Sequence, residues 1–311
     1  MKNVKKVLLF NSILFVLIII AEIILIPGLN IKKDGIFESV NYELLGEKKD
    51  SVDVIFLGDS LVYSSISPME IWNDYGYTTF DCTEAAQIIS NAYKYLKFAI
   101  ENQHPKIVMM EANVIFRNPS KRKTEDKIAS FVKKMLPITK YHDNWKKYID
   151  NGSKDQWINY NKGYKYITNT KKSKNIKYMK FSKKYDKIPE QNKPYIKKII
   201  DLCNRNNVKL ILVSLPTQKA WKYTKHNTTA KIAKENNLEF IDLNLIDVNI
   251  NWETDTKDSG AHLNYLGAKK ISNYIGNYLK DNELIIDHRN DINYKSWHIA
   301  YQKYQQKLVN K

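Results

Sequence analysis

The sequence predicts an α/β fold: a three-layer α/β/α sandwich in which a parallel sheet lies between two layers of helices. Two observations predict this fold. Short apolar runs rich in Val and Ile recur along the chain, and longer amphipathic stretches lie between or after them. Right-handed crossovers between parallel strands cover both faces of the sheet, and they leave the binding crevice at the carboxyl ends of the strands. The chain has 311 residues, of which 43% are apolar, which is enough for one large domain or two small ones.

The amino terminus predicts a membrane anchor. Residues 7–27 contain a single acid, Glu22, among nearly continuous Leu, Ile, Val and Phe, and three lysines precede them. At ~1.5 Å per residue this run reaches ~30 Å, the thickness of the bilayer hydrocarbon. A cleaved signal peptide is the nearest alternative, but its apolar region is usually only ~7 to 15 residues long. The lysines favour a cytoplasmic amino terminus. We therefore expect residues 1–30 to form a cytoplasmic arm and a single transmembrane helix, and residues 31–311 to form an extracytoplasmic domain of the cell membrane.

The remaining elements follow in order. The predicted strands cover residues 52–57, 78–82, 106–110, 209–214 and 239–243, and the predicted helices cover residues 91–102, 195–206 and 265–280. The tail carries Trp297, Tyr301 and Tyr304 at helical spacing, which predicts a final amphipathic helix.

A long basic insertion separates the third and fourth predicted strands. Residues 117–198 contain 24 Lys and Arg against 7 Asp and Glu, an excess equal to the whole formal net charge of +17. The segment also carries Trp145 and Trp157, so we expect it to fold as a cap over the strand ends. Its charge is explained either by a solvated lysine-rich surface or by a rim that attracts an anionic polymer or rests on an anionic membrane.

The cysteines and histidines do not form a metal-binding pattern. Cys82 and Cys203 lie far apart in different predicted elements, so we expect no disulfide. Neither cysteine has a second cysteine or a histidine at ligand spacing, and the six histidines are scattered. We expect no metal and no cofactor.

Two polar segments contain residues that can carry out chemistry. Gly58-Asp59-Ser60-Leu61 follows the first predicted strand, and residues 258–264, Asp-Ser-Gly-Ala-His-Leu-Asn, precede the helix over residues 265–280. A serine at a strand-to-helix turn exposes its hydroxyl at the end of the sheet. To act as a nucleophile, this hydroxyl needs a base, and the base needs a partner that holds its tautomer. His262 and Asp258 are of the right types for these roles.

These spaced segments resemble the SGNH, or GDSL-type, superfamily of hydrolases and acyltransferases, whose fold is flavodoxin-like. The resemblance implies that Ser60 is the nucleophile, and that His262 and Asp258 are the base and its partner. The superfamily usually has Asp-x-x-His, whereas this chain has one residue more between the two, and Asp255 is the alternative partner. The resemblance covers residues 52–115 and 208–280 and leaves the basic insertion outside.

The same resemblance implies an oxyanion hole, a set of donors that bind the negative oxygen formed during acyl transfer. Its donors would be the backbone N–H of Ser60, the backbone N–H of Ala86 in a turn after the second strand, and the side chain of Asn113. Asp59 and His142 are predicted to contact the substrate. His142 belongs to the segment Tyr141 to Trp145. This segment resembles a His and Trp pair found in a membrane-anchored branch of the superfamily.

Together these features predict serine-dependent acyl transfer or ester hydrolysis. Within the superfamily, the predicted anchor, the basic insertion and the motif at residues 258–264 most resemble the membrane-anchored branch that modifies bacterial envelope polymers. This resemblance implies a substrate such as teichoic acid, a surface polysaccharide or another acylated sugar, and a multi-pass membrane acyltransferase as a partner. The alternative is a catalytically degenerate scaffold or polymer-binding protein. Nucleic acid is not an expected partner, because the lysines are predicted to lie outside the cell and no nucleic-acid-binding motif is present.

Overall fold

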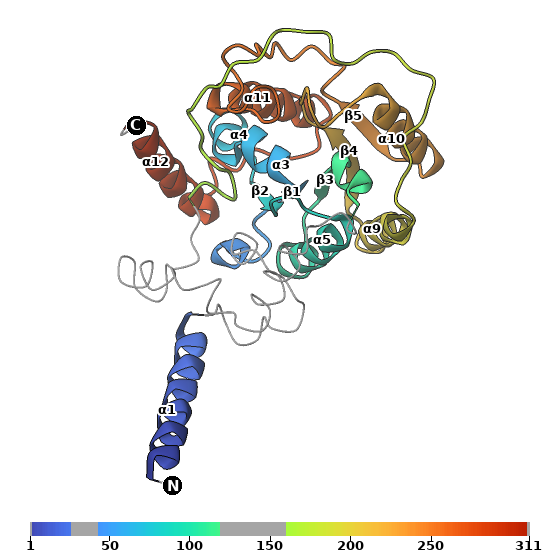
Figure 1. Cartoon of the computed structure of the whole chain (residues 1–311). Coiled ribbons are helices and arrows are strands. Elements are labelled where there is room, and N and C mark those ends of the chain that lie inside the picture. Colours follow the sequence, from blue (N-terminus) through green and yellow to red (C-terminus); the bar gives the residue numbers. More distant parts are fainter. Residues whose placement is uncertain (1, 26–42, 119–159, 310–311) are drawn as a thin grey trace.

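Five parallel strands form a single sheet at the centre of the fold (Figure 1). The computed structural model describes residues 2–25, 43–118 and 160–309. The strand order is β2-β1-β3-β4-β5. The strands are β1 (Val54–Gly58), β2 (Thr79–Thr83), β3 (Ile107–Glu111), β4 (Lys209–Ser214) and β5 (Glu239–Asp242). The predicted parallel α/β sheet is confirmed. The first and last residues of every predicted strand lie within two residues of those observed.

Helices cover both faces of the sheet. Figure 1 shows α5 and α9 on one side of it and α3, α4 and α11 on the other. The helices are α1 (Lys2–Leu25), α3 (Ser60–Ser65), α4 (Pro68–Tyr75), α5 (Ile89–Gln103), α9 (Lys193–Arg205), α10 (Tyr223–Glu235), α11 (Tyr265–Asp281) and α12 (Lys295–Val309). Short 3-10 helices are η2 (Glu43–Gly46), η3 (Ala112–Phe116), η5 (Glu190–Asn192) and η6 (Ile292–Tyr294). Helices α3, α4 and α10 were not predicted, because α3 and α4 are short and α10 buries few apolar side chains.

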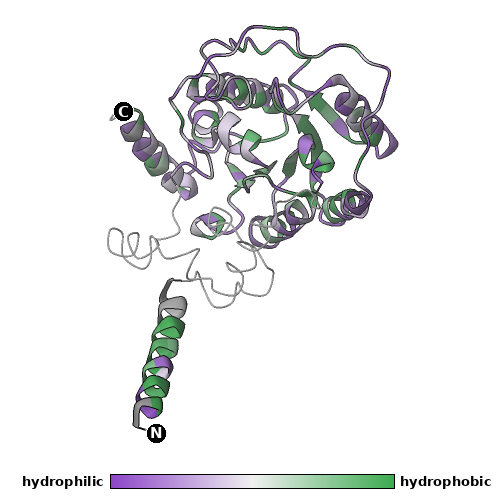
Figure 2. Ribbon diagram, viewed as in Figure 1, coloured by the Kyte–Doolittle hydropathy of each residue, from purple (hydrophilic) through white to green (hydrophobic). Residues whose placement is uncertain are grey.

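The strands alternate their side chains between two apolar clusters. On β1, Ile55 and Leu57 pack in the cluster that also holds residues of α5 and α9, whereas Val54 and Phe56 pack with residues of α3 and α11. This alternation follows from the two-residue period of a strand, and it explains why both faces of the sheet are apolar. Figure 2 shows hydrophobic residues on the strands and mixed colouring on the helices that cover them.

Helix α1 carries the apolar amino-terminal sequence. Within residues 2–25, 43–118 and 160–309, no helix has both the length and the apolar character needed to cross a membrane. The predicted span, residues 7–27, extends beyond Leu25, where α1 ends, into residues outside the described part of the chain.

The described end of the basic insertion wraps around the domain. In Figure 1 the yellow-green segment runs past α11 and α10 before it reaches α9. Its backbone N–H groups at Lys165, Lys171 and Asp186 donate to the carbonyl groups of Tyr63, Thr256 and Thr224, respectively, at 2.8, 3.1 and 3.0 Å. The segment therefore joins α3, the loop before α11, and α10. Residues 119–159, which include Trp145 and Trp157, lie outside the described part.

Asp81 on the edge strand β2 is an unusual buried acid. Its side chain is fully buried, and neither carboxyl oxygen has a hydrogen-bond partner in the described structure. Burial raises the pKa of Asp81 well above its ordinary value. The folded protein thus favours the neutral acid, whereas the unfolded chain ionises at the ordinary pKa.

We expect this acid to make the protein less stable as the pH rises. The contribution of Asp81 to stability is complete below its unfolded pKa and is lost as the pH rises toward the raised folded pKa, by ~1.4 kcal/mol for each unit of separation. Asp81→Asn should therefore lose less unfolding free energy between pH 5 and pH 8 than the wild type does, as measured by urea denaturation of the full chain. Asp74→Asn, at an exposed position, is the control. Equal pH dependence in wild type and Asp81→Asn would contradict the prediction.

Candidate active site

Ser60 is the first residue of α3. The residue before it, Asp59, follows β1 and is the N-cap of α3. The turn needs glycine at position 58 because of close packing. A Cβ atom added there would lie 2.7 Å from the Glu111 Cβ and 2.5 Å from the Val62 Cγ2, both too near for a real side chain. The Asp59 side chain accepts the Leu61 N–H at 2.9 Å and begins the helix. This turn leaves Ser60 partly exposed at the carboxyl end of β1.

His262 and Asp258 lie beside this serine. The Ser60 Oγ and the His262 Nε2 are 2.8 Å apart, although 202 residues separate them in the chain. The His262 Nδ1 lies 2.6 Å from the Asp258 Oδ2. An ionised carboxylate only accepts hydrogen bonds, so this contact places the ring proton on Nδ1 and leaves Nε2 free to accept the serine proton. The arrangement is that of a nucleophile, a general base and an orienting acid.

The extra residue between Asp258 and His262 is absorbed by a tight loop. Ser259 and Gly260 both have left-handed backbone conformations, with φ of 60° and 86°. The loop brings the Asp258 Oδ1 within 2.7 Å of the His262 backbone N–H, which donates to it. The alternative partner, Asp255, is buried and its Oδ2 accepts from the Lys270 Nζ at 2.7 Å. The structure therefore places Asp258, and not Asp255, against the histidine.

The charge of Asp258 suits this position. Burial acts to raise the pKa of Asp258, but hydrogen bonds from the His262 side chain and backbone outweigh burial, and the net pKa lies below the ordinary value. The carboxylate thus stays ionised at neutral pH. The stability that this contact contributes is present above the unfolded pKa of the acid and is lost as the pH falls through the folded pKa.

The three predicted oxyanion donors do not bond to the described part of the protein. The backbone N–H groups of Ser60 and Ala86 and the Asn113 Nδ2 form no hydrogen bond with any described residue. Ala86 has a left-handed φ of 53° in the turn after β2, and the N–H of Glu84 in that turn donates to the Gly58 carbonyl at 3.3 Å. The turn therefore lies beside the end of β1, where Ser60 begins α3.

Asp59 does not face the substrate, contrary to our prediction. Its side chain is fully buried, and its Oδ2 accepts hydrogen bonds from the Arg117 Nε, at 2.7 Å, and from the Arg117 Nη2. Asp59 also caps α3, so its buried carboxylate is occupied by contacts within the protein. The side chain of Glu111 is also buried there. Burial raises the pKa of Glu111 well above its ordinary value, and the charge of Asp59 raises it further.

Three further side chains lie in this site and were not predicted from the sequence: Arg117, Glu111 and Lys225. Arg117 partners Asp59, the Glu111 carboxylate accepts the Asn113 backbone N–H at 2.9 Å, and the Lys225 Nζ donates to the Asn113 Oδ1 at 2.7 Å. No spacing signal connects Arg117 or Lys225 to the motifs. Glu111 stands in the segment Glu111-Ala112-Asn113, but sequence alone does not show that its carboxyl group is buried. The remaining predicted contact, His142, lies outside the described residues.

Several lysines lie near the loop that carries His262 and Asp258. The Lys219 Nζ donates to the Asp258 carbonyl at 3.3 Å, and the Lys165 Nζ lies 4.1 Å from the centre of the Tyr63 ring, one turn of α3 from Ser60. Partial burial lowers the pKa of Lys257, the charge of Asp258 opposes this, and the charge of Lys165 adds to it. These interactions place positive charge beside Asp258 and beside α3, the helix that begins with Ser60.

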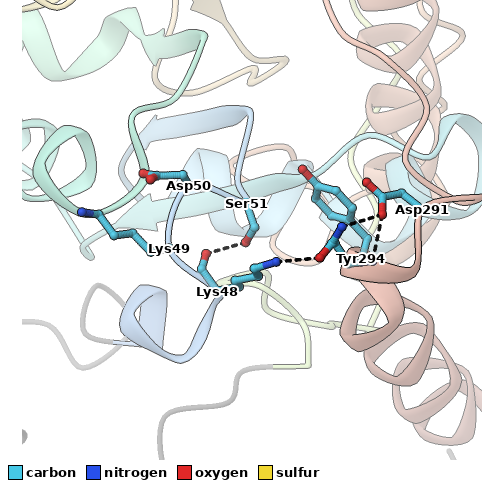
Figure 3. A pocket seen from close by; sticks show the side chains of 7 residues that line it. Lys48, Lys49, Asp50, Ser51, Asp291 and Tyr294 are labelled. Atoms are coloured by element: carbon cyan, nitrogen blue, oxygen red, sulfur yellow. Dashed lines mark hydrogen bonds between the residues drawn. The ribbon is translucent and has the colours of Figure 1, made fainter.

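A polar pocket of about 190 Å³ lies away from these residues. It is lined by Lys48, Lys49, Asp50, Ser51, Asp291, Asn293 and Tyr294, and Figure 3 shows it from close by. Residues 48–51 precede β1 and Ser60 follows it, so the pocket and the serine lie at opposite ends of this strand. Within the described ranges, no group of three His, Cys, Asp or Glu side chains is placed to hold a metal ion. Cys82 and Cys203 are buried free thiols.

Comparison with known proteins gives structural matches only. No protein-family model matches the chain, and no curated protein matches it. Among solved structures, it is similar to a putative acylhydrolase from Bacteroides fragilis, with 15% identity, a TM-score of 0.43, and coverage of 82% of this chain and 99% of that one. A GDSL-like lipase from Bacteroides thetaiotaomicron matches with 15% identity, a TM-score of 0.42, and coverage of 79% and 100%. A family 3 carbohydrate esterase from Clostridium thermocellum matches with 13% identity, a TM-score of 0.39, and coverage of 74% and 96%.

Proposed function

We propose that the chain is a serine-dependent esterase or O-acyltransferase that acts on ester-linked acyl groups. One observation carries the proposal: the Ser60 Oγ, His262 and Asp258 form a continuous chain of contacts, with distances of 2.8 and 2.6 Å. A structural serine does not need a histidine whose other nitrogen is held by a carboxylate, whereas a nucleophile needs both.

The reaction proceeds in two steps. The His262 Nε2 takes the proton of Ser60 while the Ser60 Oγ attacks the acyl carbonyl, and the oxygen of this carbonyl becomes negative. The backbone N–H groups of Ser60 and Ala86 and the Asn113 Nδ2 donate to that oxygen. The carbonyl re-forms, the leaving alcohol takes the proton from His262, and an acyl-serine remains. Water or a second hydroxyl then gives its proton to His262 and attacks the acyl carbonyl. The bond to the Ser60 Oγ breaks, His262 returns the proton to this oxygen, and an acid or a new ester is released.

We propose further that the substrate is an anionic glycopolymer of the bacterial envelope or another acylated sugar. The lysines next to the site, Lys165, Lys219 and Lys257, support a negatively charged substrate, because local positive charge raises the concentration of anions at a cleft. The basic insertion extends the same charge. Transfer to a sugar hydroxyl, instead of to water, requires that water be kept from the acyl-serine, and a segment that covers the strand ends would serve this purpose.

The proposed location is the outer side of the cell membrane, with a single anchor at the amino terminus. The apolar, largely exposed side chains of α1 between Val7 and Ile20 support this location. A multi-pass membrane acyltransferase would supply the acyl group from the other side. A reporter fused to the carboxyl terminus tests the orientation, and a cytoplasmic signal would overturn it.

A fluorophosphonate probe tests the catalytic proposal. The full chain in detergent is expected to label, and Ser60→Ala is expected to remain unlabelled. Ser64→Ala is a matched control and is expected to label like the wild type. Ser64 lies one turn later in α3, and its hydroxyl donates to the Ser60 carbonyl at 2.7 Å. A wild-type protein that does not label would favour the alternative, a scaffold or polymer-binding protein. Comparison of ester content in envelopes with and without the active protein then shows whether esters are added or removed.

A further inference from the structure

Lys225 lies in the first turn of α10 and reaches the end of β3. Its Nζ donates to the Asn113 Oδ1 at 2.7 Å and to the Ala220 carbonyl at 2.7 Å. The ammonium group is 5.4 Å from the centre of the Phe116 ring and 6.0 Å from that of Trp221. The lysine is therefore held by two acceptors and two aromatic rings, whereas exposed lysines are usually free to move.

This contact determines which way the Asn113 amide points. An ammonium group has three donors and no acceptor, so it can pair only with the oxygen end of an amide. Asn113 is 4% exposed, and its backbone N–H is already held by Glu111 at 2.9 Å. With its Oδ1 occupied and its backbone fixed, the residue has only its Nδ2 left to donate.

The charge on Lys225 also acts on the strength of that donor. A positive charge on the oxygen end of an amide draws electron density from the nitrogen end, and hydrogen bonds in such chains strengthen one another. Partial burial among Phe116 and Trp221 reduces the screening of this effect by water.

We propose that Lys225 is a positioning residue for the oxyanion hole, which orients and polarises Asn113 so that its Nδ2 binds the negative oxygen of the transition state. The inference rests on the proposed function, because it assigns a role within that reaction. It adds a residue from α10, far in sequence from each motif that the superfamily resemblance supplied.

The test is a double-mutant cycle with 4-nitrophenyl acetate as substrate and the full chain in detergent. Lys225→Met is expected to lower kcat by about 10- to 100-fold with little change in KM, since the missing interaction matters only in the transition state. In an Asn113→Ala background, where the amide is gone, the same substitution should have no further effect on kcat. Lys234→Met, at an exposed lysine of α10, is the control that should leave kcat unchanged.

Several outcomes overturn the inference. Unchanged kcat in Lys225→Met, or a loss that multiplies with that of Asn113→Ala, would show that the lysine does not act through the amide. Lys225→Gln, a second variant with a neutral donor, covers the case in which Lys225→Met does not fold, and it should also lower kcat. A wild-type chain that fails to label with fluorophosphonate would overturn the proposed function and this inference together, whereas a labelled wild type with unaffected Lys225 variants overturns the inference alone.

Discussion

Replacing Asp258 with asparagine is expected to lower kcat by about 10⁴-fold without unfolding the protein. The reason lies in the two hydrogen bonds that this side chain accepts. The Asp258 Oδ1 accepts the His262 backbone N–H at 2.7 Å, and the Oδ2 lies 2.6 Å from the His262 Nδ1. An asparagine must keep its oxygen toward the backbone donor, so its amino group turns toward Nδ1.

This turn would change the tautomer of the histidine. With a donor facing Nδ1, the ring proton moves to Nε2, the atom that lies 2.8 Å from the Ser60 Oγ. The Nε2 then cannot accept the proton of the serine. Asp247→Asn, at an exposed aspartate, is the control. Steady-state hydrolysis of 4-nitrophenyl acetate measures kcat for the two variants and the wild type. An Asp258→Asn variant with wild-type kcat would show that the carboxylate has no part in the reaction.

Replacing Arg117 with methionine is expected to lower the free energy of unfolding by ~3 to 5 kcal/mol. Asp59 is fully buried, and Arg117 supplies two of the hydrogen bonds that it accepts, one of them at 2.7 Å. Loss of the guanidinium leaves a buried carboxylate without a counter-charge next to the buried Glu111. The effect should also reach the site, since Asp59 caps the helix that begins with Ser60.

Urea denaturation of the full chain measures this change. Arg205→Met is the matched control, because Arg205 is exposed on α9 and its guanidinium donates to the Asp201 carbonyl at 3.1 Å. We expect it to cost less than ~0.5 kcal/mol. Adding Asp59→Asn to Arg117→Met should recover part of the loss, since the uncompensated charge is then gone. Similar midpoints for the two arginine variants would contradict the prediction.

The sheet was predictable because its signals are local. A buried parallel strand needs an apolar run such as residues 209–214, and this run has the observed bounds of β4. The amphipathic helices α5, α9 and α11 were predictable for the same reason, because each must bury one face. Helix α10 was not predictable in this way, because most of its residues are polar and few of them are buried apolar side chains.

The candidate site was predictable only in part. Ser60 and His262 stand at a strand-to-helix turn and before a helix, and parallel topology brings such positions to one edge of the sheet. The spacing left Asp255 and Asp258 as alternatives. The left-handed conformations of Ser259 and Gly260 decide between them, and they depend on contacts such as the Gln218 side chain, which leaves no room for a Cβ atom at position 260.

By itself, the sequence determined the parallel α/β sheet, the order of its strands along the chain, and the identity of a serine and a histidine that could react together. Only the tertiary structure decided which carboxylate orients the histidine, that Asp59 points inward to Arg117, and that Lys225 holds Asn113. The physical reason is the range of the interactions. Apolar periodicity acts over a few residues and is visible in the sequence. A buried polar group is instead satisfied by whichever partner the fold brings within about 3 Å, and for the Asn113 amide that partner is 112 residues away.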